Sequence, residues 1–147
     1  MSNTNEMMVE FSGIAQNESF ARMVVAAFIT RTNPTLEEVS DIKTAVSEAV
    51  TNSIIHGYEE TRGKISIKAK IEGRTVFIEV KDDGKGISDI KKAMEPMYTS
   101  KPEEDRSGMG FSFMEAFMDK LVVESEDGKG TIVRMWKEIG VSKHQYE

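Results

Sequence analysis

Cysteine is absent from the 147-residue sequence, and histidine occurs only at His56 and His144. The lack of cysteine excludes disulfide bonds, thiol catalysis and thiolate zinc sites, and it fits a reducing compartment such as the cytoplasm, where we expect the protein. The two histidines do not have the helical spacing of a metal-binding pair. No Gly-x-Ser-x-Gly sequence is present, which excludes the nucleophile elbow of the serine hydrolases.

Long apolar runs and an excess of basic residues are also missing. The longest apolar run, Met23–Ile29, is too short to span a bilayer, and residues 1–10 lack the pattern of a signal peptide, so we expect no membrane association. The net charge is −6 at pH 7. Because duplex-DNA binders gain most of their affinity from basic side chains on phosphates, we expect no direct nucleic-acid binding.

Two segments have the apolar spacing of amphipathic helices. The first covers residues 18–30, and Asn33-Pro34 breaks the chain after it. Thr35 and Glu38 then form a capping-box pattern that opens a second helix, which we expect to end near Gly57. The predicted core side of the first helix is Phe20, Met23, Val24, Ala27 and Phe28, and that of the second is Val39, Ile42, Val46, Val50 and Ser53.

Strands are indicated by alternating apolar and polar side chains over residues 7–12, 64–71, 76–80, 120–125 and 131–137. Residues 88–107 show no regular pattern, which predicts a functional lid, and a helix over residues 109–119 follows. Because helices and strands do not alternate as βαβ units, we expect a single α+β domain over residues 1–147. It would be a two-layer sandwich with a mixed, mostly antiparallel sheet, helices on one face, and a frayed tail over about 139–147.

The second predicted helix carries a carboxylate and an amide on one face. Glu48 and Asn52 are four residues apart, so their side chains are neighbours on the side away from the predicted core. A carboxylate in such a pair can act as a general base beside an amide that binds a metal ion. Taken alone, such a pair is more often a solvated polar surface.

Two glycine motifs follow along the chain. Asp82-x-Gly84-x-Gly86 comes directly after a strand, where an aspartate can accept a hydrogen bond from the amino group of a base, and a plain surface turn is the alternative. Gly108-x-Gly110 precedes an apolar helix, whose first N–H groups suit a phosphate chain, and a flexible helix entry is the alternative. Neither motif is a Walker loop or a Rossmann fingerprint.

In this order, together with Gly130-Thr131, the motifs resemble the GHKL (Bergerat-type) ATPase family, which includes gyrase, MutL and sensor histidine kinases. The resemblance covers about residues 36–136. Within the family the chain is most similar to the anti-sigma factor kinases, through residues 17–22, 47–58 and 101–111. It resembles their sporulation branch more than their stress-response branch. Ser100 departs from the sporulation pattern, which has a second threonine there, but retains a hydroxyl.

The resemblance implies an ATP-dependent serine kinase and gives each motif a role. Asp82 would bind the adenine amino group with support from Thr131 through water, and Gly86, close to Gly84, would let the base approach the backbone. The set that would hold the phosphates is Thr99, Ser100, Lys101, Arg106, Ser107, Gly108, Met109 and Gly110.

The resemblance also implies the metal, the base and the partners. Asn52 would coordinate a Mg²⁺ ion that bridges the phosphates, and Glu48 would orient or deprotonate the attacking hydroxyl. One partner would be a sigma factor of the sigma-F type, and the other a small anti-anti-sigma protein that is phosphorylated on serine. Arg22 would contact both, with a solvated surface charge as the alternative. The family also forms homodimers.

Other interpretations are a stress-response-type anti-sigma-B kinase, a stand-alone histidine-kinase-like ATPase domain, a clamp-type ATPase, and a binding module with a decayed ATP site. A histidine kinase needs a helix pair with a phosphoacceptor histidine, and a clamp-type ATPase needs a transducer domain. We find neither in this sequence. The presence of both Glu48 and Asn52 argues against decay.

Overall fold

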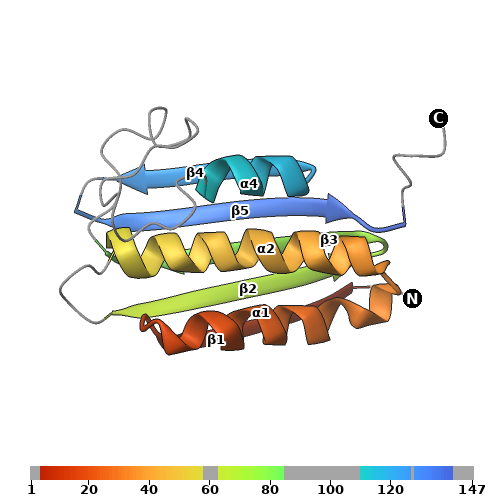
Figure 1. Ribbon diagram of the computed structural model, residues 1–147, viewed down its shortest axis with the longest axis horizontal. Coiled ribbons are helices and arrows are strands. Elements are labelled where there is room, and N and C mark those ends of the chain that lie inside the picture. The colour runs from red at the N-terminus through yellow and green to blue at the C-terminus, as the bar shows by residue number, and fades with distance from the viewer. Residues whose placement is uncertain (1–3, 58–62, 85–109, 127, 141–147) are drawn as a thin grey trace.

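The computed structural model describes residues 4–57, 63–84, 110–126 and 128–140. Five strands form one sheet in the order β1-β2-β3-β5-β4, and the helices cover one of its faces (Figure 1). This confirms the predicted α+β two-layer sandwich. All four strand pairings are antiparallel, and the predicted sheet was mostly antiparallel. Short turns join β2 to β3 and β4 to β5, and such hairpins pair strands antiparallel.

The strands are β1 (Thr4–Ser12), β2 (Lys64–Glu72), β3 (Thr75–Asp82), β4 (Lys120–Glu126) and β5 (Gly130–Glu138). The helices are α1 (Gln16–Ile29), α2 (Leu36–Asn52) and α4 (Gly110–Phe117), with a 3-10 turn η1 (Thr30–Thr32) and a π-helical turn η2 (Ser53–Gly57). The predicted lid lies outside the described residues. Ile139 is fully buried, and the predicted tail beyond Gly140 also lies outside them. Within the described part of the chain, no helix has the length and apolar character needed to cross a membrane.

The side of α1 that packs against the core is not the side that carries its predicted apolar stripe. The fully buried residues are Ala21, Val25 and Ile29. Of the predicted stripe, Phe20, Met23 and Ala27 are exposed, and Val24 and Phe28 are partly buried. Small and β-branched side chains let α1 pack closely. The exposed Phe20 ring packs edge to face on Phe11 of β1, with ring centroids 5.8 Å apart.

The start of α2 is fixed by the predicted capping box. Thr35 Oγ1 accepts a hydrogen bond from the Glu38 N–H at 3.1 Å, and Glu38 Oε1 accepts one from the Thr35 N–H at 2.8 Å. The other carboxylate oxygen of Glu38 accepts the N–H of Gly140 at 2.8 Å, which ties the chain after β5 to this helix end. α2 therefore lies in a defined register between α1 and α4, and its far end is placed at the end of β3 (Figure 1).

A buried lysine links α4 to α2. Lys137, on the helix-facing side of β5, is 5% exposed. Its Nζ donates to the carbonyl of Phe117, the last residue of α4, at 2.6 Å and lies 3.7 Å from Asp41 of α2. A buried ammonium is unfavourable unless it is paired, so these contacts are expected to be strongly maintained. They fix the end of α4 at Phe117 against α2.

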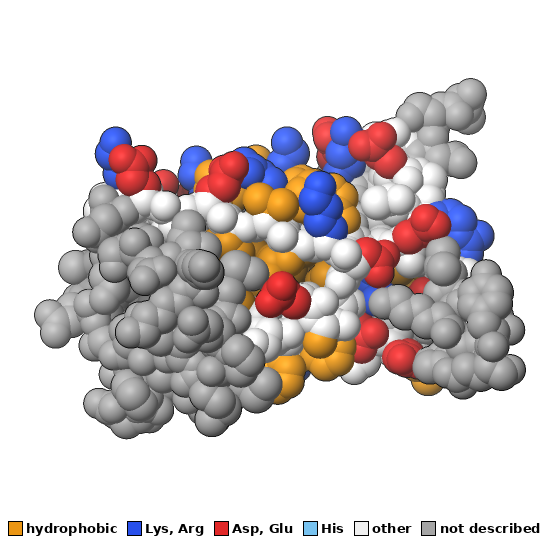
Figure 2. Space-filling view, turned by 90° about the horizontal axis from the view of Figure 1, so that it is seen from above, with side chains coloured by type: hydrophobic (Ala, Val, Ile, Leu, Met, Phe, Trp, Pro, Cys, Tyr) orange, Lys and Arg blue, Asp and Glu red, His pale blue; other side chains and the backbone are white. Residues whose placement is uncertain are grey.

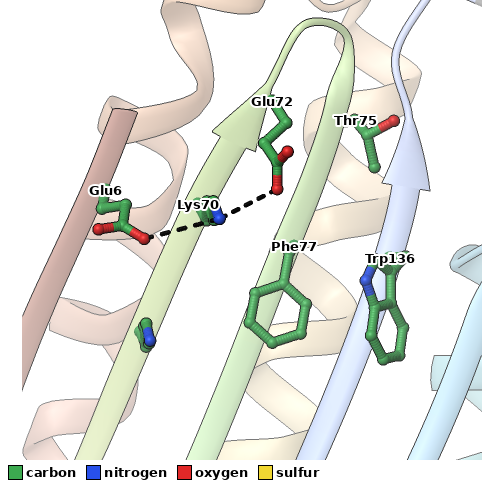
Figure 3. A pocket seen from close by; sticks show the side chains of 7 residues that line it. Glu6, Lys70, Glu72, Thr75, Phe77 and Trp136 are labelled. Atoms are coloured by element: carbon green, nitrogen blue, oxygen red, sulfur yellow. Dashed lines mark ion pairs between the residues drawn. The ribbon is translucent and has the colours of Figure 1, made fainter. Parts of the chain in front are cut away.

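The opposite face of the sheet carries charged side chains around one aromatic pair. Phe77 and Trp136 are neighbours in register, with ring centroids 5.1 Å apart. Beside them Lys70 pairs with Glu72 at 3.1 Å and with Glu6 at 3.9 Å, around a cavity of about 280 Å³ (Figure 3). Seen from the β4 edge, acidic and basic side chains are interspersed along the upper border of the molecule (Figure 2). Because strand side chains alternate between faces, this cavity lies on the side of the sheet away from the helices.

Candidate nucleotide-binding site

β3 ends on a buried aspartate. Val76, Ile78 and Val80 face the helices and alternate with more exposed positions, and Asp82 continues this buried side with 3% exposure. Asp82 lies opposite Thr131 of β5 in the sheet register. Since a buried charge without partners is strongly unfavourable, the groups that surround this carboxylate decide what it can do.

A hydrogen-bond donor meets each oxygen of the Asp82 carboxylate. Ser53 Oγ donates to Oδ2 at 2.7 Å, and the main-chain N–H of Gly84 donates to Oδ1 at 2.9 Å. Burial raises the pKa of Asp82, and the hydrogen bonds from Ser53, Gly84 and the Thr131 main chain oppose this rise without cancelling it. An ionised carboxylate can accept about four hydrogen bonds, so Asp82 keeps capacity for a donor on a ligand.

Gly130 lets β5 approach the end of β3 closely. Its φ is +97°, and a Cβ at this position would overlap the main-chain oxygen of Asp82 and lie 2.8 Å from the Cα of Asp83. Ser125 of β4 holds the same turn, because its hydroxyl donates to the Gly130 carbonyl at 3.0 Å. The turn between β4 and β5 therefore lies in close backbone contact with Asp82, the aspartate at the centre of the site.

Gly130→Ala is expected to lower the free energy of unfolding by about 2 kcal/mol or more, since it adds a backbone clash to the strain of a positive φ. Gly128→Ala is the matched control. Gly128 also has a positive φ, +82°, but a Cβ there would meet nothing within 4 Å. Its expected loss is about 1 kcal/mol. Equal losses in urea unfolding would show that close approach to Asp82 is not what position 130 requires.

Glu48 and Asn52 lie one turn apart in the last part of α2, and both are half-buried. Asn52 is the last α-helical residue, and Ser53, which touches Asp82, follows it directly. Glu48 and Asn52 therefore lie on the same end of α2 as Ser53, whose hydroxyl reaches the aspartate of β3. Gly110, another predicted residue, is the first residue of α4, the helix fixed against α2.

The amide oxygen of Asn52 is the kind of single protein ligand expected for a Mg²⁺ ion that is held mainly by a nucleotide. Among the described residues no group of three or more His, Cys, Asp or Glu side chains is arranged to bind a metal ion. Mg²⁺ commonly takes one or two protein oxygens and completes its six ligands with substrate phosphates and water. A single amide oxygen on a helix end suits that kind of site.

Several predicted site residues lie outside the described residues. They are Gly86, Thr99, Ser100, Lys101, Arg106, Ser107, Gly108 and Met109. The structure brings together the others that were predicted for the nucleotide base, Asp82, Gly84 and Thr131. Arg22 lies apart from them on α1.

Ser53 is a site residue that the sequence pattern did not identify. Its spacing predicts a core position, and it is indeed buried, with 5% exposure. Its hydroxyl nevertheless donates a hydrogen bond to the Asp82 carboxylate. The available signal was a polar residue on an otherwise apolar helix side, directly after Asn52.

Arg22 lines a groove between α1 and α2. Its Nε donates to Glu18 Oε2 at 2.7 Å, and Glu18 Oε1 accepts the hydroxyl of Ser47 from α2 at 2.8 Å. The side chain of Arg22 is 39% exposed, and the groove, of about 360 Å³, also includes Leu36 and Lys43. Arg22 therefore forms an ion pair on α1 and remains partly accessible.

Known sequences are similar to this chain over most of its length. The chain matches the histidine kinase-like ATPase domain family over residues 14–137. It is 61% identical to an anti-sigma F factor of Thermoanaerobacter sp. (strain X514) over 143 residues, which cover 97% of this chain and 100% of that relative. It is 59% identical to an anti-sigma F factor of Clostridium botulinum (strain Eklund 17B / Type B) over 138 residues, which cover 93% and 96%.

Solved structures show the same fold at low sequence identity. The RsbU and RsbW domains of Rv1364c from Mycobacterium tuberculosis match with a TM-score of 0.67 and 17% identity, over 92% of this chain and 32% of that one. The catalytic domain of the histidine kinase ThkA matches with a TM-score of 0.56 and 17% identity, over 90% of this chain and 96% of that one. These two similarities concern the fold alone.

Proposed function

We propose that this chain is an ATP-dependent protein kinase that holds a sigma factor inactive, because it belongs to the histidine kinase-like ATPase domain family and, within that family, to the anti-sigma F factors. The sigma factor is of the sigma-F type. The kinase substrate is a serine on a small anti-anti-sigma protein, and the protein works as a homodimer.

The observation that carries the ATP site is the buried carboxylate of Asp82. It is oriented by Ser53 and Gly84 and retains capacity for one further donor. The amino group of adenine supplies such a donor. The base then lies against the end of β3 and close to the end of α2, because Asp82 faces the helices and binds Ser53.

The phosphates extend from there toward the end of α2 and the start of α4. Asn52 would hold Mg²⁺, and Gly110 begins a helix whose first N–H groups can meet phosphate. Mg²⁺, when bound, neutralises charge on the phosphates. Because the net charge of the chain is −6, these local groups must supply the positive surroundings of ATP.

Phosphoryl transfer in this site requires positioning more than covalent catalysis. Glu48 accepts the proton of the serine hydroxyl, whose oxygen forms a bond to the γ-phosphorus while the bond to the β-phosphate oxygen breaks. ADP leaves, and the partner carries a phosphoserine. Glu48 lies one turn from Asn52 on α2, so base and metal ligand share one rigid helix.

The partner proteins bind at the surface that includes Arg22. This guanidinium is held by Glu18 and remains partly accessible in the groove between α1 and α2. An arginine fixed in this way offers directed donors to an acidic side chain of a partner.

Mixing the purified chain with ATP, Mg²⁺, the sigma factor and the anti-anti-sigma protein tests this proposal. Transfer of phosphate to a serine of the second protein, and capture of the sigma factor, are the expected results. Phosphate found on a histidine of the chain itself would instead indicate a histidine-kinase-like domain, and no bound sigma factor would remove the anti-sigma role.

Asn52→Ala is expected to raise the Kd for ATP about tenfold or more, since a metal ligand is lost, which corresponds to about 1.4 kcal/mol. EDTA should raise the Kd of the unmodified protein in the same way. If Asn52 acts through the metal ion, the two changes are not additive, because they remove the same interaction. Full additivity in calorimetric titrations would exclude Asn52 as the metal ligand.

A further inference from the structure

We propose that Ser53 determines which nucleotide base the site accepts, because its hydroxyl holds the Asp82 carboxylate as a hydrogen-bond acceptor for an amino group. The site then takes adenine and rejects a base that presents a carbonyl oxygen at the same place. This role rests on the proposed ATP-binding function and adds a positioning residue to it, since Ser53 acts through Asp82.

Both partners of this hydrogen bond are shielded from water. Ser53 is 5% exposed and Asp82 is 3% exposed. The distance of 2.7 Å from Ser53 Oγ to Asp82 Oδ2 is in the range of charge-assisted hydrogen bonds, which are stronger than neutral ones. The hydroxyl has a single proton, and it donates this proton in a hydrogen bond to the carboxylate oxygen.

The two donors fix the orientation of the carboxylate from two directions. Gly84, in the segment after β3, holds Oδ1, and Ser53, at the end of α2, holds Oδ2. Ser53 also begins the π-helical turn η2, and its own N–H reaches the carbonyls of both Ala49 and Val50. Such wider turns often occur at functional sites. Here the turn begins at the residue whose side chain reaches the sheet.

The protonation state of the carboxyl decides which base it can bind. An ionised carboxylate only accepts hydrogen bonds, whereas a protonated carboxyl can also donate one. The ionised form therefore suits the amino group of adenine and repels the carbonyl oxygen that inosine presents there. Burial favours the protonated form, and the hydrogen bond from Ser53 opposes it. The charged group that acts on Asp82 besides these is Asp83, which also favours protonation.

Titration of ATP and of inosine triphosphate into the protein in a buffer that contains Mg²⁺ tests this role. The unmodified chain should prefer ATP. Ser53→Ala should narrow the ratio of the two Kd values about tenfold, as expected for loss of a hydrogen bond to a charged group. Ser53→Thr keeps the hydroxyl and should retain most of the preference. Ser66→Ala, on the face of the sheet away from the helices, is the control and should leave both Kd values unchanged.

The outcomes separate this inference from the proposed function. If Ser53→Ala weakens ATP and inosine triphosphate equally, or changes neither, Ser53 has only a structural role and the inference is overturned while ATP binding stands. If the unmodified chain binds neither nucleotide, the proposed function fails and the inference fails with it. Urea unfolding of each variant at the titration temperature establishes that the folded protein is being compared.

Discussion

Replacing Glu48 with alanine is expected to slow phosphoryl transfer to the partner serine about 10²–10⁴-fold, while the Kd for ATP stays within about threefold of its original value. In the proposed mechanism Glu48, one turn before Asn52 on α2, takes part only when the serine hydroxyl loses its proton. Single-turnover transfer from labelled ATP measures the first quantity, and calorimetry measures the second.

Glu115→Ala is the matched control for this change, because Glu115 is an exposed carboxylate on α4. It should leave both quantities unchanged. Glu48→Gln keeps the size of the side chain and an oxygen that accepts hydrogen bonds, but it cannot act as a base. If this variant is as slow as Glu48→Ala, the role of Glu48 is to remove the proton of the serine hydroxyl rather than to orient that hydroxyl. Normal transfer by Glu48→Ala would remove the base assignment altogether.

The second large effect is expected at Asp82. Asp82→Asn should raise the Kd for ATP at least about tenfold, because the adenine amino group loses a charged acceptor worth about 1.5–3 kcal/mol. Asp83→Asn is the control, since Asp83 is the exposed neighbour in the chain, and it should change the Kd by less than about twofold. Equal effects of the two substitutions would contradict the placement of the base at Asp82.

The same substitution should not destabilise the fold at neutral pH. Burial raises the pKa of Asp82 above its usual value of 3.8, so both folded and unfolded chains bind the proton in strong acid and no penalty arises there. As the pH rises through the folded-state pKa, ionisation of the buried group increasingly opposes folding. Asp82→Asn removes this term, and the Ser53 hydroxyl can turn to accept from the new amide.

Urea unfolding between pH 4 and pH 8 measures this prediction. The free energy of unfolding of Asp82→Asn should equal or exceed that of the unmodified chain at pH 7, and the difference should shrink toward acid. A variant that binds ATP poorly but is at least as stable identifies Asp82 as a functional residue. A large loss of stability at pH 7 would instead assign it a structural role.

Local chemistry made part of this structure predictable. The capping box of Thr35 and Glu38 fixes the start of α2 within the sequence itself, and the alternation in β2 and β3 defines a hairpin. Asp82 was predicted through the order of the motifs, because an aspartate before two glycines is, taken alone, also typical of a plain surface turn. These signals depend on residues that are close in the chain.

The remaining features depend on contacts between distant segments. The buried side of α1 is chosen by the fit of Ala21 and Val25 against the rest of the core, which the size of Phe20 and Met23 does not reveal. Ser53 has the spacing of a core residue, and only the contact with Asp82, 29 residues away, shows its role. The sheet order, with β5 between β3 and β4, likewise follows from long-range pairing.

A crystal structure of the chain with Mg²⁺ and a non-hydrolysable ATP analogue tests the central claim most directly. The account predicts the adenine amino group within hydrogen-bonding distance of the Asp82 carboxylate, with the Ser53 hydroxyl still donating to that carboxylate and the phosphates beside Asn52. A nucleotide bound at any other place, with Asp82 still enclosed by its present partners, would contradict it.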